Sequence, residues 1–177
     1  MMRLSIVKSS SSLLRRISQR RFISDFKDTG FHEYVVRAIR NAGFEAPLRA
    51  QGLTMPRMIM KDERVPHRVV ASETGSGKTL TYLSSISHDF KTSFSDDGDA
   101  ALVLCPNQTL CDQVHRTAKS LVDEDEPLLV SEILSGTNAP RCDIHGDDSY
   151  SRTNLYISTP GSLINHMENF MDRGRQR

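Results

Sequence analysis

The chain has 177 residues, which is enough for one ordinary hydrophobic core, and its apolar content of 37% and charged content of 25% are those of a globular protein. Its formal net charge of +1 gives no general attraction to nucleic acid. No apolar run approaches the roughly 20 residues of a membrane-spanning helix, so no membrane partner is expected.

The first 24 residues differ in composition from the rest of the chain. They are rich in arginine and serine and contain no acid, because the first acidic residue is Asp25. Such a start is typical of an organellar presequence, and "RRFIS" at residues 20–24 resembles a mitochondrial processing site. We predict a disordered targeting presequence at 1–24, for the mitochondrion or alternatively the plastid. A basic tail that binds nothing is the other interpretation.

Two helices are predicted next. In "FHEYVVRAIRNAGF" (31–44), Val35, Val36 and Ile39 fall on one helical face, and Gly43 stands where a helix would end. A second helical stretch runs from about 48 to 60 and is expected to be interrupted by Pro56.

The remainder alternates between predicted strands and helices. "HRVVAS" is a β-branched strand that enters a glycine turn, and "KTLTYLSSISHDF" is the helix after it. "ALVLCP" is a buried strand, and Asn107 is expected to cap a helix that reaches about Leu121. "DEDEP" is predicted as a loop, "LLVSEILSG" and "NLYIST" as strands, and Pro160 as the first residue of a last helix. This alternation predicts an α/β fold, a parallel sheet with helices on both faces.

The glycine turn "ASETGSGKT" has the form of a phosphate-binding loop, with Ala71 taken as the first residue of the pattern. Gly75 and Gly77 let the backbone N–H groups converge on an anion. Lys78 would lie along the β and γ phosphates as the catalytic residue, and the Thr79 hydroxyl would bind Mg²⁺. The predicted phosphate ligands are Ser72, Glu73, Thr74, Gly75, Ser76, Gly77, Lys78 and Thr79.

The sequence before this turn resembles the Q motif of DEAD-box RNA helicases. Phe26 stands 17 residues before Gly43, and "GFEAPLRAQ" follows the family pattern G-F-x-x-P-T-x-I-Q as far as Gln51. The resemblance implies ATP as the nucleotide, bound through Phe26 and Gln51, because a glutamine amide can pair with the N6 amine and N7 of adenine. Leu48 and Ala50 depart from the family's threonine and isoleucine.

Three later segments resemble the RNA-binding motifs of the same family: "CPNQTLCDQ", "SGT" at 135–137 and "STPGSL" at 158–163. The resemblance, which covers about 26–170, implies contacts with the RNA backbone and little sequence preference. Gln108 and Ser162 replace arginines of the family, which removes charge at the phosphates. The implied RNA-binding residues are Asn107, Gln108, Gly136, Thr159 and Gly161.

The resemblance also implies the domain organisation. Residues 25–52 would be the Q-motif region, and 53–177 part of a RecA-like P-loop domain, three layers deep and incomplete at its C-terminus. The Cys-Pro-Asn form is similar to an organellar, plant-like branch. No D-E-A-D sequence occurs in these residues, and a second RecA-like domain is expected in the full-length protein.

We therefore expect an enzyme family of ATP-dependent RNA helicases, with a chain that by itself binds ATP without turnover. The alternatives are a non-catalytic fragment that binds ATP and RNA, and a P-loop NTPase of another family. A zinc site formed by Cys111, His115, Cys142 and His145 is a lesser reading, beside ordinary buried thiols and surface histidines.

Overall fold

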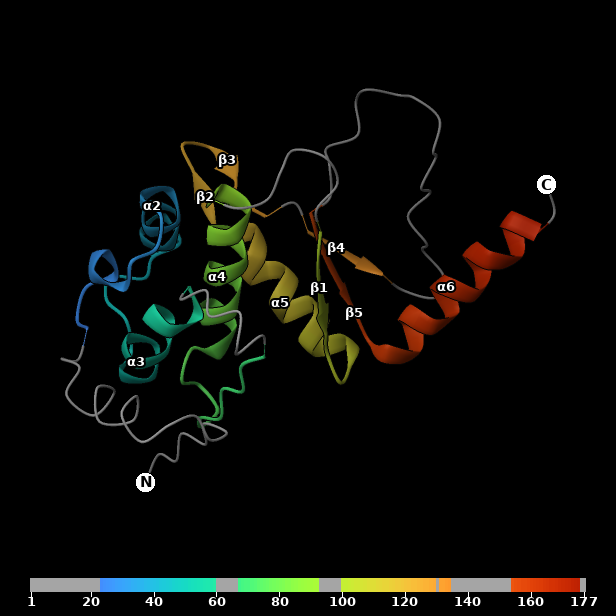
Figure 1. Ribbon diagram of the computed structural model, residues 1–177, viewed down its shortest axis with the longest axis horizontal. Helices are drawn as coiled ribbons and strands as arrows, with labels where there is room; N and C mark the ends of the chain where they lie inside the picture. Colours follow the sequence, from blue (N-terminus) through green and yellow to red (C-terminus); the bar gives the residue numbers. More distant parts are fainter. Residues whose placement is uncertain (1–22, 60–66, 93–99, 130, 135–153, 176–177) are drawn as a thin grey trace. The chain divides into compact units, whose positions relative to one another are not determined.

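The computed structural model describes residues 23–59, 67–92, 100–129, 131–134 and 154–175. The chain divides into two compact units, residues 1–93 and 94–177, and Figure 1 labels the helices and strands of each. Within the described residues, no helix combines the length and the apolar character needed to cross a bilayer.

The described residues of the first unit form only helices. They are the 3₁₀ helix η1 (Phe26–Thr29), α2 (Glu33–Asn41), α3 (Arg49–Met58) and α4 (Lys78–Thr92). Helix α4 contacts both α2 and α3, and η1 contacts the same two helices. Burial of apolar side chains is the main force that holds such an arrangement together. The buried apolar residues of this unit are Phe26, Phe31, Val35, Val36, Ala38, Ile39, Met55, Leu80 and Leu83.

Helix α2 begins and ends through specific polar contacts. His32 precedes it, and the His32 ring accepts a hydrogen bond from the Tyr34 N–H (3.4 Å). The backbone N–H of His32 donates to Nδ1 of His88 on α4 (2.9 Å), which connects the start of α2 to α4. After the helix, Gly43 adopts a φ of 88°, the left-handed conformation of a helix stop. The predicted helix and its glycine end are confirmed.

Helix α3 differs from the prediction at Pro56, because the helix is not interrupted there and continues to Met58. A proline inside a helix lacks an N–H and crowds the carbonyl four residues earlier. That carbonyl belongs to Gly52, and the helix ends two residues after the proline. The helix thus continues for two residues beyond Pro56 without the backbone hydrogen bond that proline cannot donate to the Gly52 carbonyl.

Residues 67–73 do not form the predicted strand, although they lead into the glycine turn as expected. They have no regular structure, and the Val69 side chain is 76% exposed. A β-branched sequence becomes a strand only where a neighbouring strand completes its backbone hydrogen bonds. No described strand is paired with this segment.

The second unit contains a parallel sheet in the order β1-β5-β4. Its elements are β1 (Ala101–Leu104), α5 (Gln108–Ser120), β2 (Val122–Asp123), β3 (Glu126–Pro127), β4 (Ser131–Leu134), β5 (Leu155–Ser158) and α6 (Pro160–Arg175). The central strand β5 pairs Leu155 with Ala101 on one side and with Ser131 on the other. The parallel strands and alternating helices confirm the predicted α/β class (Figure 1).

The two faces of this sheet are buried to different degrees. Leu155 and Ile157 of β5 are both 0% exposed, and α5 packs against β4 and β5. In β1, Leu102 is paired with Tyr156 and Leu104 with Ser158, so neither leucine is paired with Leu155 or Ile157. These two leucines are 49% and 51% exposed. Because successive side chains of a strand point to opposite faces, the exposed leucines lie on one face and the buried pair on the other.

The segment predicted as the loop "DEDEP" is a tight antiparallel hairpin instead. Strands β2 and β3 pair Asp123 with Glu126, and the two turn residues, Glu124 and Asp125, have φ angles of 50° and 65°. Such a two-residue turn requires left-handed φ at both positions. The ends are fixed by the Leu128 N–H, which donates to the buried Leu121 carbonyl (3.0 Å). The acidic residues of this segment therefore form a regular hairpin turn, although their composition predicts a loop.

Candidate nucleotide-binding site

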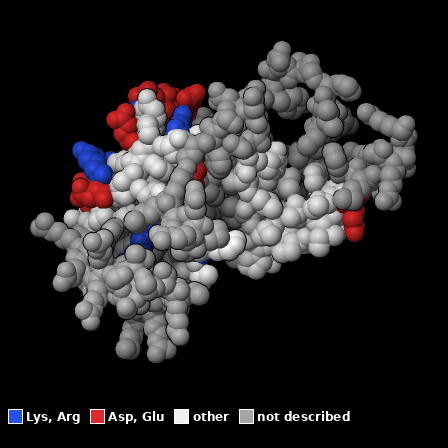
Figure 2. Space-filling view, in the orientation of Figure 1, with Lys and Arg blue, Asp and Glu red and all other residues white. Residues whose placement is uncertain are grey.

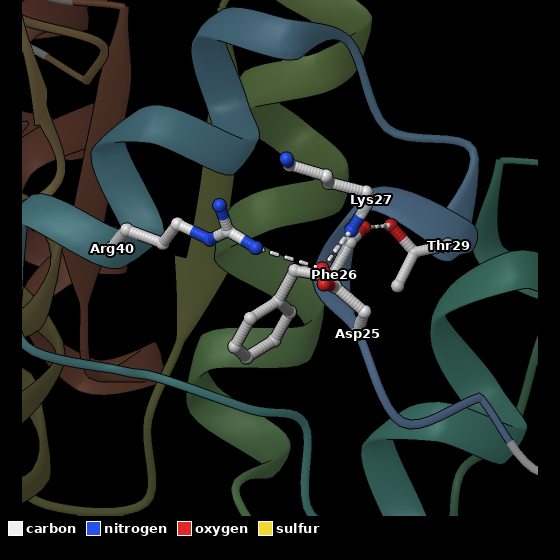
Figure 3. Close-up of polar contacts among 5 residues, drawn as sticks. All are labelled: Asp25, Phe26, Lys27, Thr29 and Arg40. Atoms are coloured by element: carbon white, nitrogen blue, oxygen red, sulfur yellow. Dashed lines mark hydrogen bonds and ion pairs between the residues drawn. The ribbon is translucent and has the colours of Figure 1, made fainter.

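Phe26, the aromatic residue that is expected to contact the nucleotide, is a core residue. Its side chain is 0% exposed, and its carbonyl accepts a hydrogen bond from the Thr29 hydroxyl (2.5 Å). Asp25 caps η1, because its carboxylate accepts a hydrogen bond from the Lys27 N–H (2.8 Å). The same carboxylate accepts a hydrogen bond from the Arg40 guanidinium (2.8 Å) (Figure 3). The Lys27 N–H, and less strongly Arg40, hold the pKa of Asp25 below its ordinary value. Contact between Phe26 and a nucleotide stays a prediction.

Gln51 connects the Q-motif region to the glycine loop. It lies in the first turn of α3 and is 3% exposed. Its Oε1 accepts the Leu48 N–H (2.8 Å), and its Nε2 donates to the Gly77 carbonyl (3.1 Å). The amide expected to read a base thus uses both of its ends on the protein, one in each of the two segments that the sequence assigns to ATP.

The glycine loop depends on glycine at two positions for different reasons. Gly75 and Gly77 have φ angles of 80° and 79°, in the left-handed region that other residues avoid. A Cβ atom on Gly75 would meet nothing within 4 Å, whereas one on Gly77 would stand 2.2 Å from Nε2 of Gln51. Gly77 is therefore needed for the close approach of Gln51 as well as for its backbone conformation.

Lys78 is turned into the loop. Its ammonium donates to the Ser72 carbonyl (2.9 Å), the Glu73 carbonyl (2.7 Å) and the Ser76 hydroxyl (3.4 Å). The hydroxyls of Ser72 and Ser76 are also hydrogen-bonded to each other, at 2.6 Å. The dipoles of the loop's own carbonyls thus stabilise the positive charge of Lys78, which is expected to bind phosphate.

Thr79 is the second residue of α4 and is half-buried. In the part of the chain that the structure describes, no group of three His, Cys, Asp or Glu side chains is placed to hold a metal ion. Thr79 offers one hydroxyl oxygen, a ligand type that Mg²⁺ accepts. This donor fits a Mg²⁺ ion whose other ligands are phosphate oxygens and water, and it does not form a protein cage.

Two of the predicted RNA-binding residues lie at the same edge of the sheet. Asn107 follows β1 and Thr159 follows β5, and these parallel strands are paired up to Leu104 and Ser158. The pairing extends one residue further, because the Cys105 N–H donates to the Ser158 carbonyl (2.8 Å). The carboxyl ends of parallel strands are the usual place for ligands in open α/β sheets.

Both residues are also helix caps. The Asn107 side chain accepts the Leu110 N–H (2.9 Å) at the start of α5, as predicted, and the Thr159 hydroxyl accepts the Ser162 N–H (3.3 Å) at the start of α6. Capped helix starts direct further N–H groups outward, where they favour an anion. Gly161 is exposed in the first turn of α6.

The charge at this edge is modest. Gln108 is exposed and donates to the Asp112 carboxylate (3.4 Å), so its amide is paired with an acid one helical turn away. On the face shown in Figure 2, the described Lys and Arg side chains lie in small groups, the larger of them beside acidic side chains. Gly136, the remaining predicted RNA-binding residue, lies outside the described residues.

The cysteines give no sign of a metal centre in the described residues. Cys105 and Cys111 are free and buried. Burial, and after it the neighbouring Cys105 thiol, raise the pKa of Cys111 to about 11, which makes it a poor thiolate ligand. Burial also lowers the pKa of His115. The other half of the suggested zinc cluster, Cys142 and His145, lies outside the described residues.

Two features of the loop were not predicted from the sequence. Counted back from Gly77, the first position of the pattern G-x-x-x-x-G-K falls on Ser72, one residue after Ala71. Thr81 was also overlooked: its N–H and its hydroxyl both donate to the Gly77 carbonyl, each at 3.1 Å. The four-residue spacing in the first helical turn is the signal that could have identified Thr81.

Comparison with known proteins agrees with this organisation. The family model described as "DEAD/DEAH box helicase" matches residues 49–176. DEAD-box ATP-dependent RNA helicase 22 of Arabidopsis thaliana is 32% identical over 156 residues, which are 81% of this chain and 25% of the relative. The chain thus spans about a quarter of the length of that relative.

Solved structures show the same fold. A DEAD box protein from the hyperthermophile Methanococcus jannaschii superposes with a TM-score of 0.64 and 25% identity, over 82% of this chain and 37% of that one. S. cerevisiae Dbp5, in a structure bound to RNA and ADP BeF3, gives a TM-score of 0.59 and 17% identity, over 82% and 34% of the two chains. The predicted RecA-like α/β fold is therefore confirmed.

Proposed function

Because the chain belongs to the DEAD/DEAH box helicase family, we propose that it is the nucleotide-binding part of an ATP-dependent RNA helicase. The observation that carries this proposal is the hydrogen bond between Gln51 Nε2 and the Gly77 carbonyl. It joins the segment expected to read the base to the loop expected to hold the phosphates. The family match does not favour the alternative of a P-loop NTPase of another family.

Different residues would bind the phosphates, the Mg²⁺ ion and the base of ATP. When the phosphates enter, the Lys78 ammonium exchanges its carbonyl partners for β and γ oxygens, and the N–H groups after Gly75 surround the same charge. Mg²⁺, held by the Thr79 hydroxyl together with phosphate oxygens, would offset the remaining negative charge. Gln51, released from one of its protein partners, would bind the adenine edge.

RNA would bind at the edge formed by the ends of β1 and β5. Asn107, Thr159 and Gly161 all stand at the start of a helix, where polar groups and backbone N–H groups suit phosphate oxygens. Such contacts do not read bases and give little sequence preference. Gln108 and Ser162 supply hydrogen bonds without positive charge, so we propose a weaker salt dependence than two arginines would give.

Residues 1–24 are proposed to direct the protein to the mitochondrion, on the strength of their composition alone. A fluorescent reporter fused to residues 1–30 should enter mitochondria and be cleaved near Phe22 or Ile23. The matched control replaces Arg15, Arg16, Arg20 and Arg21 by serine. A diffuse cytosolic signal from the unmodified fusion would refute targeting, and a plastid signal would correct only the organelle.

The nucleotide preference tests the proposed function directly. The chain should bind ATP and ADP well ahead of GTP, because guanine presents an acceptor where adenine presents its N6 amine. Gln51→Ala should remove most of this difference, as measured by titration with the unlabelled nucleotides. Gln113→Ala, on the exposed face of α5, is the control and should leave the preference intact. Equal affinity of the unmutated chain for ATP and GTP would contradict the assignment of Gln51.

A further inference from the structure

Ser72 makes an unusual contact for its place in the loop. The phosphate-binding pattern begins with glycine, which has no side chain, yet here the first position is a serine whose hydroxyl is bonded to the Ser76 hydroxyl at 2.6 Å. Both residues are half-buried, which protects this bond from competition with water. The bond joins the first and fifth residues of the pattern directly, across the loop.

The same two serines hold Lys78. The Ser72 carbonyl and the Ser76 hydroxyl both accept from its ammonium, and the Glu73 carbonyl between them accepts at 2.7 Å. The Ser76 N–H in addition donates to the Glu73 carbonyl (3.3 Å), which closes the turn. The acceptors thus face the lysine at the place where the loop would have to receive phosphate oxygens.

We propose that Ser72 is a positioning residue that keeps the loop closed around Lys78, so that a nucleoside triphosphate binds only after the Ser72–Ser76 hydrogen bond opens. This inference rests on the proposed function, since it concerns entry of ATP into the same loop. A ligand must supply the free energy that opens a closed state, and its apparent affinity falls by the fraction of chains that are open.

The direction in which Ser72→Ala changes nucleotide binding distinguishes this role from two others. Ser72→Ala removes the hydroxyl and keeps the Ser72 carbonyl, so the loop should open more readily and bind nucleotide more tightly. If the hydroxyl were a phosphate ligand, the same change would weaken binding. If it only supported the fold, the change would lower thermal stability without raising the association rate.

The experiment measures association of a fluorescent ATP analogue with the full chain in Mg²⁺ buffer by stopped flow. Ser72→Ala should raise the association rate constant and the affinity by about three- to tenfold, the range expected for one hydrogen bond. Ser72→Thr, which keeps a hydroxyl, should restore the slow rate. Ser120→Ala, at a serine of α5 whose hydroxyl donates to the Thr117 carbonyl in the same helix, is the matched control. Unchanged or weaker binding by Ser72→Ala would overturn the proposal.

A second measurement does not depend on nucleotide at all. Acylation of lysine amines, followed by mass spectrometry, should modify Lys78 several times faster in Ser72→Ala than in the unmutated chain, with the exposed Lys119 as internal reference. Equal Lys78 labelling in the two proteins would refute the closed loop. Failure of the unmutated chain to bind any nucleotide, together with accelerated labelling, would instead contradict the proposed function and leave the closed loop standing.

Discussion

The carbonyl of Gly77 accepts three hydrogen bonds, from Gln51 Nε2 and from the N–H and hydroxyl of Thr81, each at 3.1 Å. This atom sits at the end of the phosphate loop and at the start of α4, so it is shared by the loop, the helix and the Q-motif region. A change in the contacts of Gln51 on binding a base would therefore act directly on the backbone that we propose to hold the phosphates. At the scale of single residues, the site is organised around this one backbone carbonyl.

A matched pair of glycine substitutions tests this organisation. Gly75→Ala and Gly77→Ala both place a side chain at a positive φ, which costs about 1 kcal/mol or more in each case. Only at Gly77 would the new Cβ collide with Gln51. Chemical denaturation should show a larger loss of stability for Gly77→Ala, and nucleotide titration a larger loss of discrimination between ATP and GTP. Equal effects of the two substitutions would contradict a role for the Gln51–Gly77 contact.

Helix α3 shows how a departure from the family pattern changes one element. Gln51 reaches back to the Leu48 N–H at 2.8 Å, which is one half of a capping box. The other half requires a side-chain oxygen at position 48, and leucine has none. Threonine, the residue that the family resemblance leads one to expect there, would complete the box. The start of α3, which carries Gln51, is therefore less constrained than it would be with threonine.

Restoring the cap should stabilise this helix. Leu48 is 51% exposed, so its replacement by alanine measures the lost apolar contact, and replacement by serine adds the missing acceptor at similar size. We expect Leu48→Ser to be more stable than Leu48→Ala by about 1 kcal/mol, the usual value for an N-cap. Denaturant unfolding of the two variants gives this difference. If the two are equally stable, the serine side chain does not cap α3.

At the scale of the whole molecule, each unit carries one part of the expected function. The unit of residues 1–93 contains Gln51 and the phosphate loop, and the unit of residues 94–177 contains the sheet edge with Asn107 and Thr159. The chain spans 25% of the length of its Arabidopsis thaliana relative. Neither unit contains a D-E-A-D sequence, which in the family resemblance supplies the acids that position Mg²⁺ and water.

Residues 1–177 by themselves are expected to bind ATP without hydrolysing it, because they contain no D-E-A-D sequence. The purified chain should bind Mg·ATP, and Lys78→Ala should abolish the binding, because the lysine is the only side-chain cation expected at the phosphates. Phosphate release should stay at the level of the Lys78→Ala protein, with or without single-stranded RNA. Release that RNA raises above this control would show that another group in these residues activates water.

Features that depend on local chemistry could be predicted from the sequence alone. Glycines before Lys78, the cap at Asn107, the stop at Gly43 and the proline at the start of α6 all act within a few residues, and each stands where it was predicted. Spacing within the Q-motif region and the phosphate loop indicated the family for the same reason.

Features that depend on residues far apart in the chain became visible only in the folded protein. Residues 67–73 have the composition of a strand but remain irregular, since a strand needs a neighbour for its backbone hydrogen bonds. "DEDEP" has the composition of a loop but forms a hairpin, because buried Leu121 and Leu128 fix its ends. The contacts of Gln51 with Gly77, across 26 positions, likewise exist only once α3 and α4 have packed together, and no local pattern contains that information.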